Sequence, residues 1–103
     1  MAEFSYQGVL SVTGTVLATG DASTPPYIRT KVVSMRFNNP AAYVIELYKY
    51  EASTSTTTLI YELTLDPGDI VTDSLVYALN PGDTITAYSD IVGTTYYVYG
   101  INY

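Results

Sequence analysis

Two tight turns constrain the fold of this chain more than any other feature of its sequence. Pro67-Gly68 lies within Leu-Asp-Pro-Gly-Asp-Ile, and Pro81-Gly82 lies within Leu-Asn-Pro-Gly-Asp-Thr. Proline fixes φ at about −65° at the first corner of such a turn, and glycine adopts the positive φ that a type II turn needs at the second. Because β-branched and apolar residues flank both turns, the sequence predicts short antiparallel strands joined by sharp reversals.

Alternation of apolar and polar residues predicts about seven strands and no helix. Val33, Met35 and Phe37, for example, alternate with Ser34 and Arg36, which is the period of a half-buried strand. The predicted strands are Tyr6–Val12 (or a longer bent strand that reaches Leu17), Ile28–Phe37, Tyr43–Tyr50, Leu59–Leu65, Ile70–Leu79, Thr84–Tyr88 and Thr95–Tyr103. Polar segments at 20–26 and 53–58 are predicted to be loops.

Short strands at this spacing predict an all-β fold. We expect residues 1–103 to form a single domain, a small antiparallel β-sandwich of about seven strands. Immunoglobulin-like and jelly-roll-like topologies both fit, because the long connection at 18–27 can cross between sheets in either. The chain contains no Cys and no Trp, so the paired cysteines and core tryptophan of immunoglobulin domains are missing.

Charge and composition exclude several classes of partner and site. The formal net charge is −6, and the basic residues are Arg29, Lys31, Arg36 and Lys49. Binding to nucleic acid or to an anionic membrane needs clustered cations, so we expect neither partner. The three cations of the 28–37 strand are expected to form a solvated or edge-protecting face. Without His and Cys, no imidazole or thiolate metal site and no Ser-His-Asp triad can form, and we expect no cofactor.

The carboxylates have two interpretations. Those near the turns, Asp66, Asp69, Asp73, Asp83 and Asp90, are expected to accept backbone N–H bonds. Ca²⁺ binding is the alternative, although their spacing matches no known calcium loop. Glu46 and Glu62 lie on predicted strands and are the candidates for a carboxylate pair that hydrolyses glycosides. Because a sandwich of this size rarely contains a deep cleft, we expect no catalytic residue and no enzymatic activity.

Tyrosine is the residue type that points to a function. The chain contains 12 tyrosines, and tyrosine combines a large apolar ring with a hydroxyl group that stays hydrogen-bonded, which suits protein interfaces. The predicted interface residues, expected to form one contact face from the 43–50 and 95–103 strands, are Tyr48, Tyr50, Tyr97, Tyr99 and Tyr103. The alternative for each of them is ordinary core or cross-strand packing.

The C-terminal third carries a resemblance. The pattern consists of Leu79, Pro81-Gly82-Asp83, Ile85, Ala87, Ser89-Asp90 and, after a short gap, Val98-Tyr99-Gly100-Ile101. It resembles the end of small virion structural proteins of tailed bacteriophages, in particular the head-decoration and capsid accessory proteins with a β-sandwich fold. Those proteins end more often in aliphatic residues than in tyrosine. The resemblance implies a virion protein, made in the host cytoplasm, that binds other virion proteins and copies of itself.

Three functions are therefore open. The first is a non-enzymatic virion structural protein, a capsid decoration or head–tail accessory protein that binds a symmetric lattice through many weak contacts. The second is a sandwich module that binds carbohydrate or a cell-surface protein, because tyrosine rings also stack on sugars. The third is a subunit of a filament or fibre.

Overall fold

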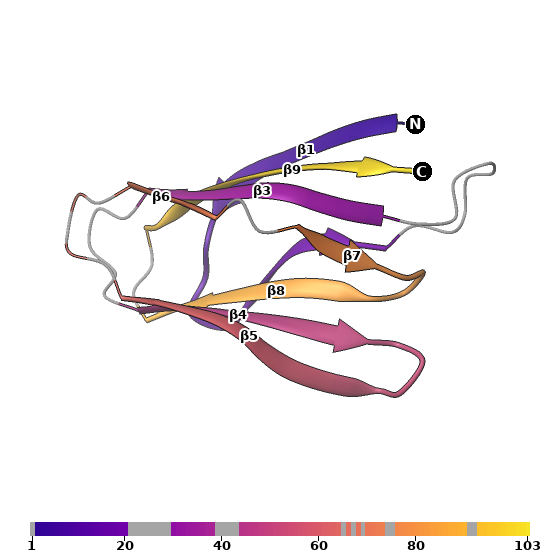
Figure 1. Ribbon diagram of the computed structural model, residues 1–103. Helices are drawn as coiled ribbons and strands as arrows, with labels where there is room; N and C mark the ends of the chain where they lie inside the picture. Colours follow the sequence, from indigo (N-terminus) through magenta and orange to yellow (C-terminus); the bar gives the residue numbers. More distant parts are fainter. Residues whose placement is uncertain are drawn as a thin grey trace.

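A computed structural model of the chain confirms the all-β sandwich. It describes residues 2–20, 30–38, 44–64, 66, 68, 70–73, 76–90 and 93–103. These residues form nine strands in two antiparallel sheets (Figure 1). The strands are β1 Ala2–Val9, β2 Thr15–Thr19, β3 Thr30–Asn38, β4 Val44–Glu51, β5 Thr56–Thr64, β6 Ile70–Asp73, β7 Tyr77–Leu79, β8 Thr84–Ser89 and β9 Thr95–Asn102.

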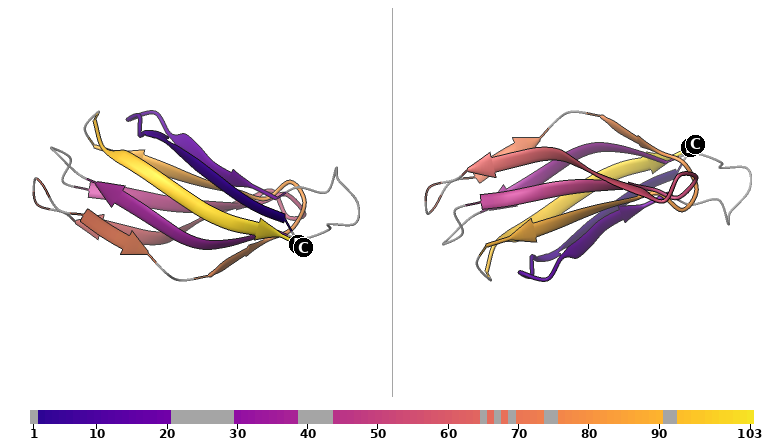
Figure 2. Two further views of the ribbon diagram at one scale, coloured as in Figure 1. Left: turned by 90° about the horizontal axis from the view of Figure 1, so that it is seen from above. Right: turned by 90° about the horizontal axis from the view of Figure 1, so that it is seen from below.

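The strand order has jelly-roll topology. Sheet A has the order β1-β9-β3-β6, with β7 also paired to β3, and sheet B has the order β2-β8-β4-β5 (Figure 2). The pairs are nested, because the first strand pairs with the last, β2 with β8, and β4 with β5 at the centre of the chain. A chain that folds as one long hairpin and then rolls up gives this double-sheet arrangement. An immunoglobulin-like order, in which the first two strands share a sheet, is not what the described strands form.

Two predicted strands are each divided in the structure. The first, Tyr6–Val12 with its extension to Leu17, becomes β1 in sheet A and β2 in sheet B. Between them the chain turns at Gly14, which has φ 107°, and the Ser11 hydroxyl donates to the Gly14 carbonyl at 3.1 Å. The predicted strand Ile70–Leu79 becomes β6 and β7, which pair with opposite ends of β3. A bulge or corner at Gly14-Thr15 was expected in the longer form of the first strand, whereas the division of Ile70–Leu79 was not predicted, because alternation along a sequence does not show where a strand changes partner.

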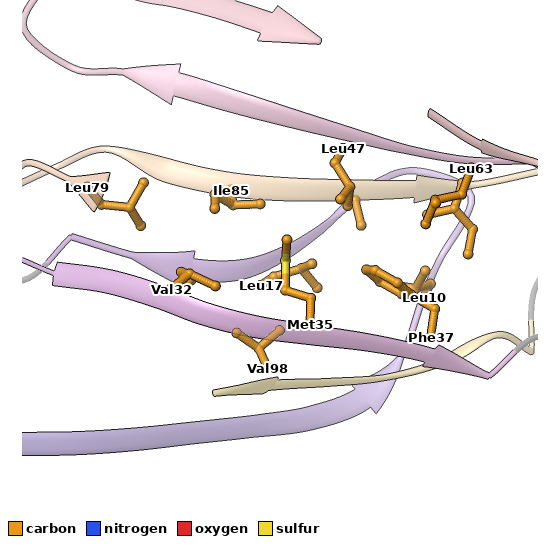
Figure 3. Packing of buried hydrophobic residues seen from close by; sticks show 13 residues of the cluster. Leu10, Leu17, Val32, Met35, Phe37, Leu47, Leu63, Leu79, Ile85 and Val98 are labelled. Atoms are coloured by element: carbon orange, nitrogen blue, oxygen red, sulfur yellow. The ribbon is translucent and has the colours of Figure 1, made fainter. Parts of the chain in front are cut away.

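The core lies between the two sheets. Met35, Phe37 and Val98 point inward from sheet A, while Leu47, Leu63 and Ile85 point inward from sheet B (Figure 3). The buried apolar residues are Leu10, Leu17, Ala18, Val32, Met35, Phe37, Ile45, Leu47, Leu63, Leu79, Ile85, Ala87 and Val98. Complete burial of one such side chain larger than alanine contributes about 1.5–3 kcal/mol. This core therefore holds the two sheets together, and the side chains on the outer faces of the sheets are not part of it.

The predicted turn geometry is present at both glycines. Gly68 has φ 90° and Gly82 has φ 86°, as type II turns require. Asp83, which follows the second turn, is 2% exposed. Its carboxylate accepts hydrogen bonds from the backbone N–H groups of Asn80 at 3.0 Å and Ala52 at 2.9 Å. The second turn is thereby tied to the β4–β5 hairpin.

Candidate contact surfaces

The outer face of sheet A combines tyrosines with cations. Along β9, Val98 points into the core, so Tyr97 and Tyr99 on either side of it point outward. Arg36 of β3 lies directly opposite Tyr97, and the Lys31 ammonium group lies 5.0 Å from the centre of the Tyr103 ring. We call this surface the basic face and define it by Lys31, Arg36, Tyr97, Tyr99 and Tyr103.

The outer face of sheet B combines tyrosines with carboxylates. Ile45 and Leu47 of β4 are buried, so the alternating residues Glu46, Tyr48 and Tyr50 lie on the outside. The Tyr48 ring meets the Tyr88 ring edge-on at 5.3 Å between centroids. Glu46 lies directly opposite Glu62 of β5 on one side and Tyr88 of β8 on the other. We call this surface the acidic face and define it by Glu46, Glu62, Tyr48, Tyr50 and Tyr88.

The predicted interface tyrosines thus occupy two surfaces instead of one. The sequence interpretation placed the 43–50 and 95–103 strands on one contact face, and this was wrong. β4 belongs to sheet B and β9 to sheet A, so Tyr48 and Tyr50 are separated by the core from Tyr97, Tyr99 and Tyr103. Tyr97 is 41% exposed and Tyr103 is 38% exposed, whereas the others are partly buried by their neighbours.

Two of these tyrosines donate hydrogen bonds to carboxylates on their own face. The Tyr48 hydroxyl donates to Glu46 Oε2 at 2.6 Å, and this bond is the main reason that the pKa of Tyr48 is raised above 10.0. A hydrogen bond to Glu3 likewise raises the pKa of Tyr99. In both cases loss of the phenolic proton would place two anions side by side. Both carboxylates therefore favour the protonated form of the neighbouring tyrosine.

We expect Glu46→Gln to lower the pKa of Tyr48 towards 10. The substitution removes the anion that holds the phenolic proton, and spectrophotometric titration of tyrosinate absorbance at alkaline pH measures the change. Glu62→Gln is the matched control, because Glu62 acts on Tyr48 only through space and raises its pKa least. A larger shift from Glu62→Gln than from Glu46→Gln would contradict the hydrogen-bonded geometry.

The turn carboxylates have structural partners. Asp83 fixes the second turn, and Asp90 Oδ1 accepts the Val44 N–H at 3.2 Å, as expected for turn aspartates. Asp69 and the side chain of Asp73 lie outside the described residues. Among the residues that are described, no group of three or more His, Cys, Asp or Glu side chains comes together. Glu46 and Glu62, the candidate hydrolytic pair, lie on an open sheet face and not in a cleft.

A shallow, open hollow of about 560 Å³ lies on the outer side of sheet A. Its lining includes Tyr97, Arg36, Gln7 and Asn38. It was not predicted from the sequence, because the pairing and register of the strands were unknown. Arg29, predicted on the same strand as Arg36, lies outside the described residues.

Two long edge strands are the other candidate contact surfaces. β1 has 8 residues and pairs with β9, and β5 has 9 residues and pairs with β4. In the part of the chain that the structure describes, no strand lies along the other side of either one. The other edge strands are shorter. β2 has 5 residues and a shift in its register, β6 has 4 residues and β7 has 3. The described segments include no helix of the length and hydropathy needed to cross a membrane.

Comparisons with known proteins support the fold. No family model matches the chain, and no curated protein matches it. Among solved structures, a chain from Bacillus endospore appendages, which are described as a novel family of disulfide-linked pili, is similar with a TM-score of 0.52 and 10% identity. The similarity covers 97% of this chain and 84% of that one. At this level of identity the similarity shows a shared fold.

Proposed function

We propose that this protein is a non-enzymatic structural subunit that assembles with copies of itself through its edge strands. The observation that carries the proposal is the sequence of the two long edges. Soluble β proteins protect their edges with charged side chains (lysine above all), proline, bulges or short strands. β1 (AEFSYQGV) and β5 (TTTLIYELT) contain no lysine or proline and one glutamate each. β1 pairs with β9 in an unbroken register, and β5 has one register shift, opposite Leu47 and Tyr48.

The position of the two edges determines the kind of assembly. β1 lies at one end of the strand order in sheet A, and β5 lies at the opposite end of the order in sheet B. If β1 of one copy pairs with β5 of the next, sheet A of the first continues into sheet B of the second. The two edges are different surfaces, so the contact is heterologous, and unless its rotation closes a ring it extends into an open fibre.

The similar solved structure supports an assembling subunit, since that chain belongs to pili. The linkage must differ in one respect. Those pili are disulfide-linked, whereas this sequence contains no Cys. Contacts between copies of this chain therefore depend on backbone pairing and side-chain packing.

The resemblance to bacteriophage virion proteins predicts a role in a virus particle. That role is a variant of the assembly proposed here. A capsid decoration protein also adheres in many copies, but it adheres to a preformed lattice. Genes for capsid, portal or terminase proteins beside this one, and co-sedimentation with capsids, would support the virion variant. Fibres grown from the isolated protein would support the filament variant.

We expect the double substitution Tyr6→Lys/Tyr61→Lys to weaken self-association at least about tenfold, which is about 1.4 kcal/mol. Tyr6 on β1 is 52% exposed and Tyr61 on β5 is 39% exposed, so each lysine places a charge on an edge without filling the core. A charged edge disfavours pairing with a second strand. Sedimentation velocity over a concentration series, with negative-stain electron microscopy of the largest species, measures the result.

Val76→Lys is the matched control. Val76 is 56% exposed and lies outside the strands, so the substitution adds one positive charge, half of what the double variant adds, at a position outside both edge strands. Assembly of this variant should equal that of the wild type. A wild-type protein that sediments as a monomer at every concentration, or double-lysine protein that assembles as well as wild type, contradicts edge pairing.

The hollow on sheet A favours a second candidate, a carbohydrate-binding module. An exposed tyrosine ring beside planar polar side chains is the arrangement that stacks on and hydrogen-bonds a sugar. Glycan-array binding that is lost in Tyr97→Ala and kept in Tyr50→Ala, on the opposite face, would establish it. Absence of binding by the wild type would remove this candidate and leave the assembly proposal unaffected.

A further inference from the structure

The charges of this chain are divided between the two outer faces. Lys31 and Arg36 lie on the basic face, with Glu3 of β1 at its margin. On the strands of sheet B, the described outward side chains include Glu46 and Glu62 and no lysine or arginine. Lys49 lies on the side of Ile85, the inner side, and pairs with Glu51 at 3.7 Å. Among the described residues, the outer face of sheet A therefore carries two cations and one carboxylate, although the net charge of the chain is −6.

The acidic face contains a feature that is unfavourable in an isolated subunit. Glu46 and Glu62 are directly opposite each other on neighbouring strands, and like charges in this position destabilise a sheet. The Tyr48 hydroxyl donates to one oxygen of Glu46, and within the described residues neither carboxylate forms an ion pair. A cation approaching from outside would offset this repulsion.

The basic face has the complementary chemistry. Arg36 is exposed beside Tyr97, and Lys31 lies over the ring of Tyr103. The acidic face in turn offers Tyr88, 38% exposed, next to Glu46. Each face thus combines a flat aromatic surface with charges of one predominant sign. Contact between two basic faces or between two acidic faces would bring like charges together, so only the mixed contact is favourable.

We propose that the acidic face of one copy binds the basic face of a second copy, so that Glu46 and Glu62 meet Lys31 and Arg36. This inference rests on the proposed function. It adds a second contact, in which the outer faces of two sheets stack on each other instead of pairing through their edge strands. The two faces differ, so each bound pair still exposes one acidic and one basic face. Further copies can therefore add, and edge-linked fibres can pack side by side.

A charge-swap experiment tests the contact. The first variant, Glu46→Lys/Glu62→Lys, has two basic faces, and the second, Lys31→Glu/Arg36→Glu, has two acidic faces. We expect each alone to associate at least tenfold more weakly than wild type in sedimentation velocity at low salt. An equimolar mixture of the two should recover association, because every contact again joins opposite charges. Wild-type association should weaken with added salt, since salt screens exposed charges.

The outcomes separate this inference from the proposed function. Wild-type protein that assembles while both variants assemble equally well overturns the face contact and leaves edge pairing standing. A mixture that fails to recover also overturns it, because the loss then has another cause. Wild-type protein that remains monomeric under all conditions overturns the proposed function and this contact with it. The isosteric Glu46→Gln/Glu62→Gln variant, with unfolding midpoints for every variant, shows whether any loss comes from misfolding.

Discussion

Replacing Asp83 with alanine is expected to lower the free energy of unfolding by about 3 kcal/mol, because hydrogen bonds to a charged acceptor are worth more than neutral ones. The carboxylate is 2% exposed and accepts the N–H groups of Asn80 and Ala52. Alanine would remove the acceptor of both N–H groups, whose hydrogen bonds to Asp83 are partly buried. Urea unfolding followed by circular dichroism measures the loss.

Two further variants serve as controls for the Asp83→Ala substitution. Asp83→Asn keeps one carbonyl oxygen as an acceptor but turns an amide group towards the other N–H, so its loss should be smaller than that of Asp83→Ala. Asp90→Ala removes an exposed turn aspartate whose bond to the Val44 N–H is 3.2 Å long, and it should cost less than either. Equal losses from Asp83→Ala and Asp90→Ala would contradict the structural role assigned to Asp83.

Local sequence patterns predicted the parts of the fold that local physics determines. The Pro-Gly pairs predicted the turns because proline restricts φ at the first corner and glycine tolerates the positive φ of the second, and Gly68 and Gly82 have the expected positive values. Alternation placed Met35 and Phe37 in the core, since consecutive strand residues point to opposite sides. It also grouped Val33 with them, which was wrong, because the register of β3 shifts between Val32 and Ser34 and Val32 is the buried residue. The hydrogen bond that Asp83 accepts from the Asn80 N–H followed from the same local reasoning, whereas its burial and its bond to the Ala52 N–H were not predicted.

The contact surfaces depend on information that local patterns lack. Alternation shows that Tyr48 and Tyr50 share a side of their strand, but it does not show which sheet the strand joins. Assignment to a sheet depends on which distant strands pair, and the β1–β9 pairing joins the two ends of the chain. Bulges add a second difficulty. The register of β5 shifts opposite Leu47 and Tyr48, which places Leu59 opposite Tyr48 on the outer side.

We expect Gly100→Ala to destabilise the protein by about 2–3 kcal/mol, the usual cost of forcing extra atoms into a packed site. Gly100 is buried in β9, between β1 and β3. A Cβ atom there would lie 2.6 Å from the Lys31 carbonyl oxygen and would overlap the Phe4 ring. The carbonyl belongs to the backbone of the neighbouring strand, so relief requires β9 and β3 to move apart.

Gly8→Ala is the matched comparison, since it adds the same methyl group to the neighbouring strand of the same sheet. Its Cβ would lie 3.1 Å from the far end of the Tyr96 ring, which can rotate away without moving the backbone. We therefore expect Gly8→Ala to stay within about 1 kcal/mol of the wild type. Urea midpoints at unchanged m-values separate the two variants. If Gly100→Ala were as mild as Gly8→Ala, β9 would not lie as close to the Lys31 carbonyl as the structure places it, and the register that defines the basic face would need to be reassigned.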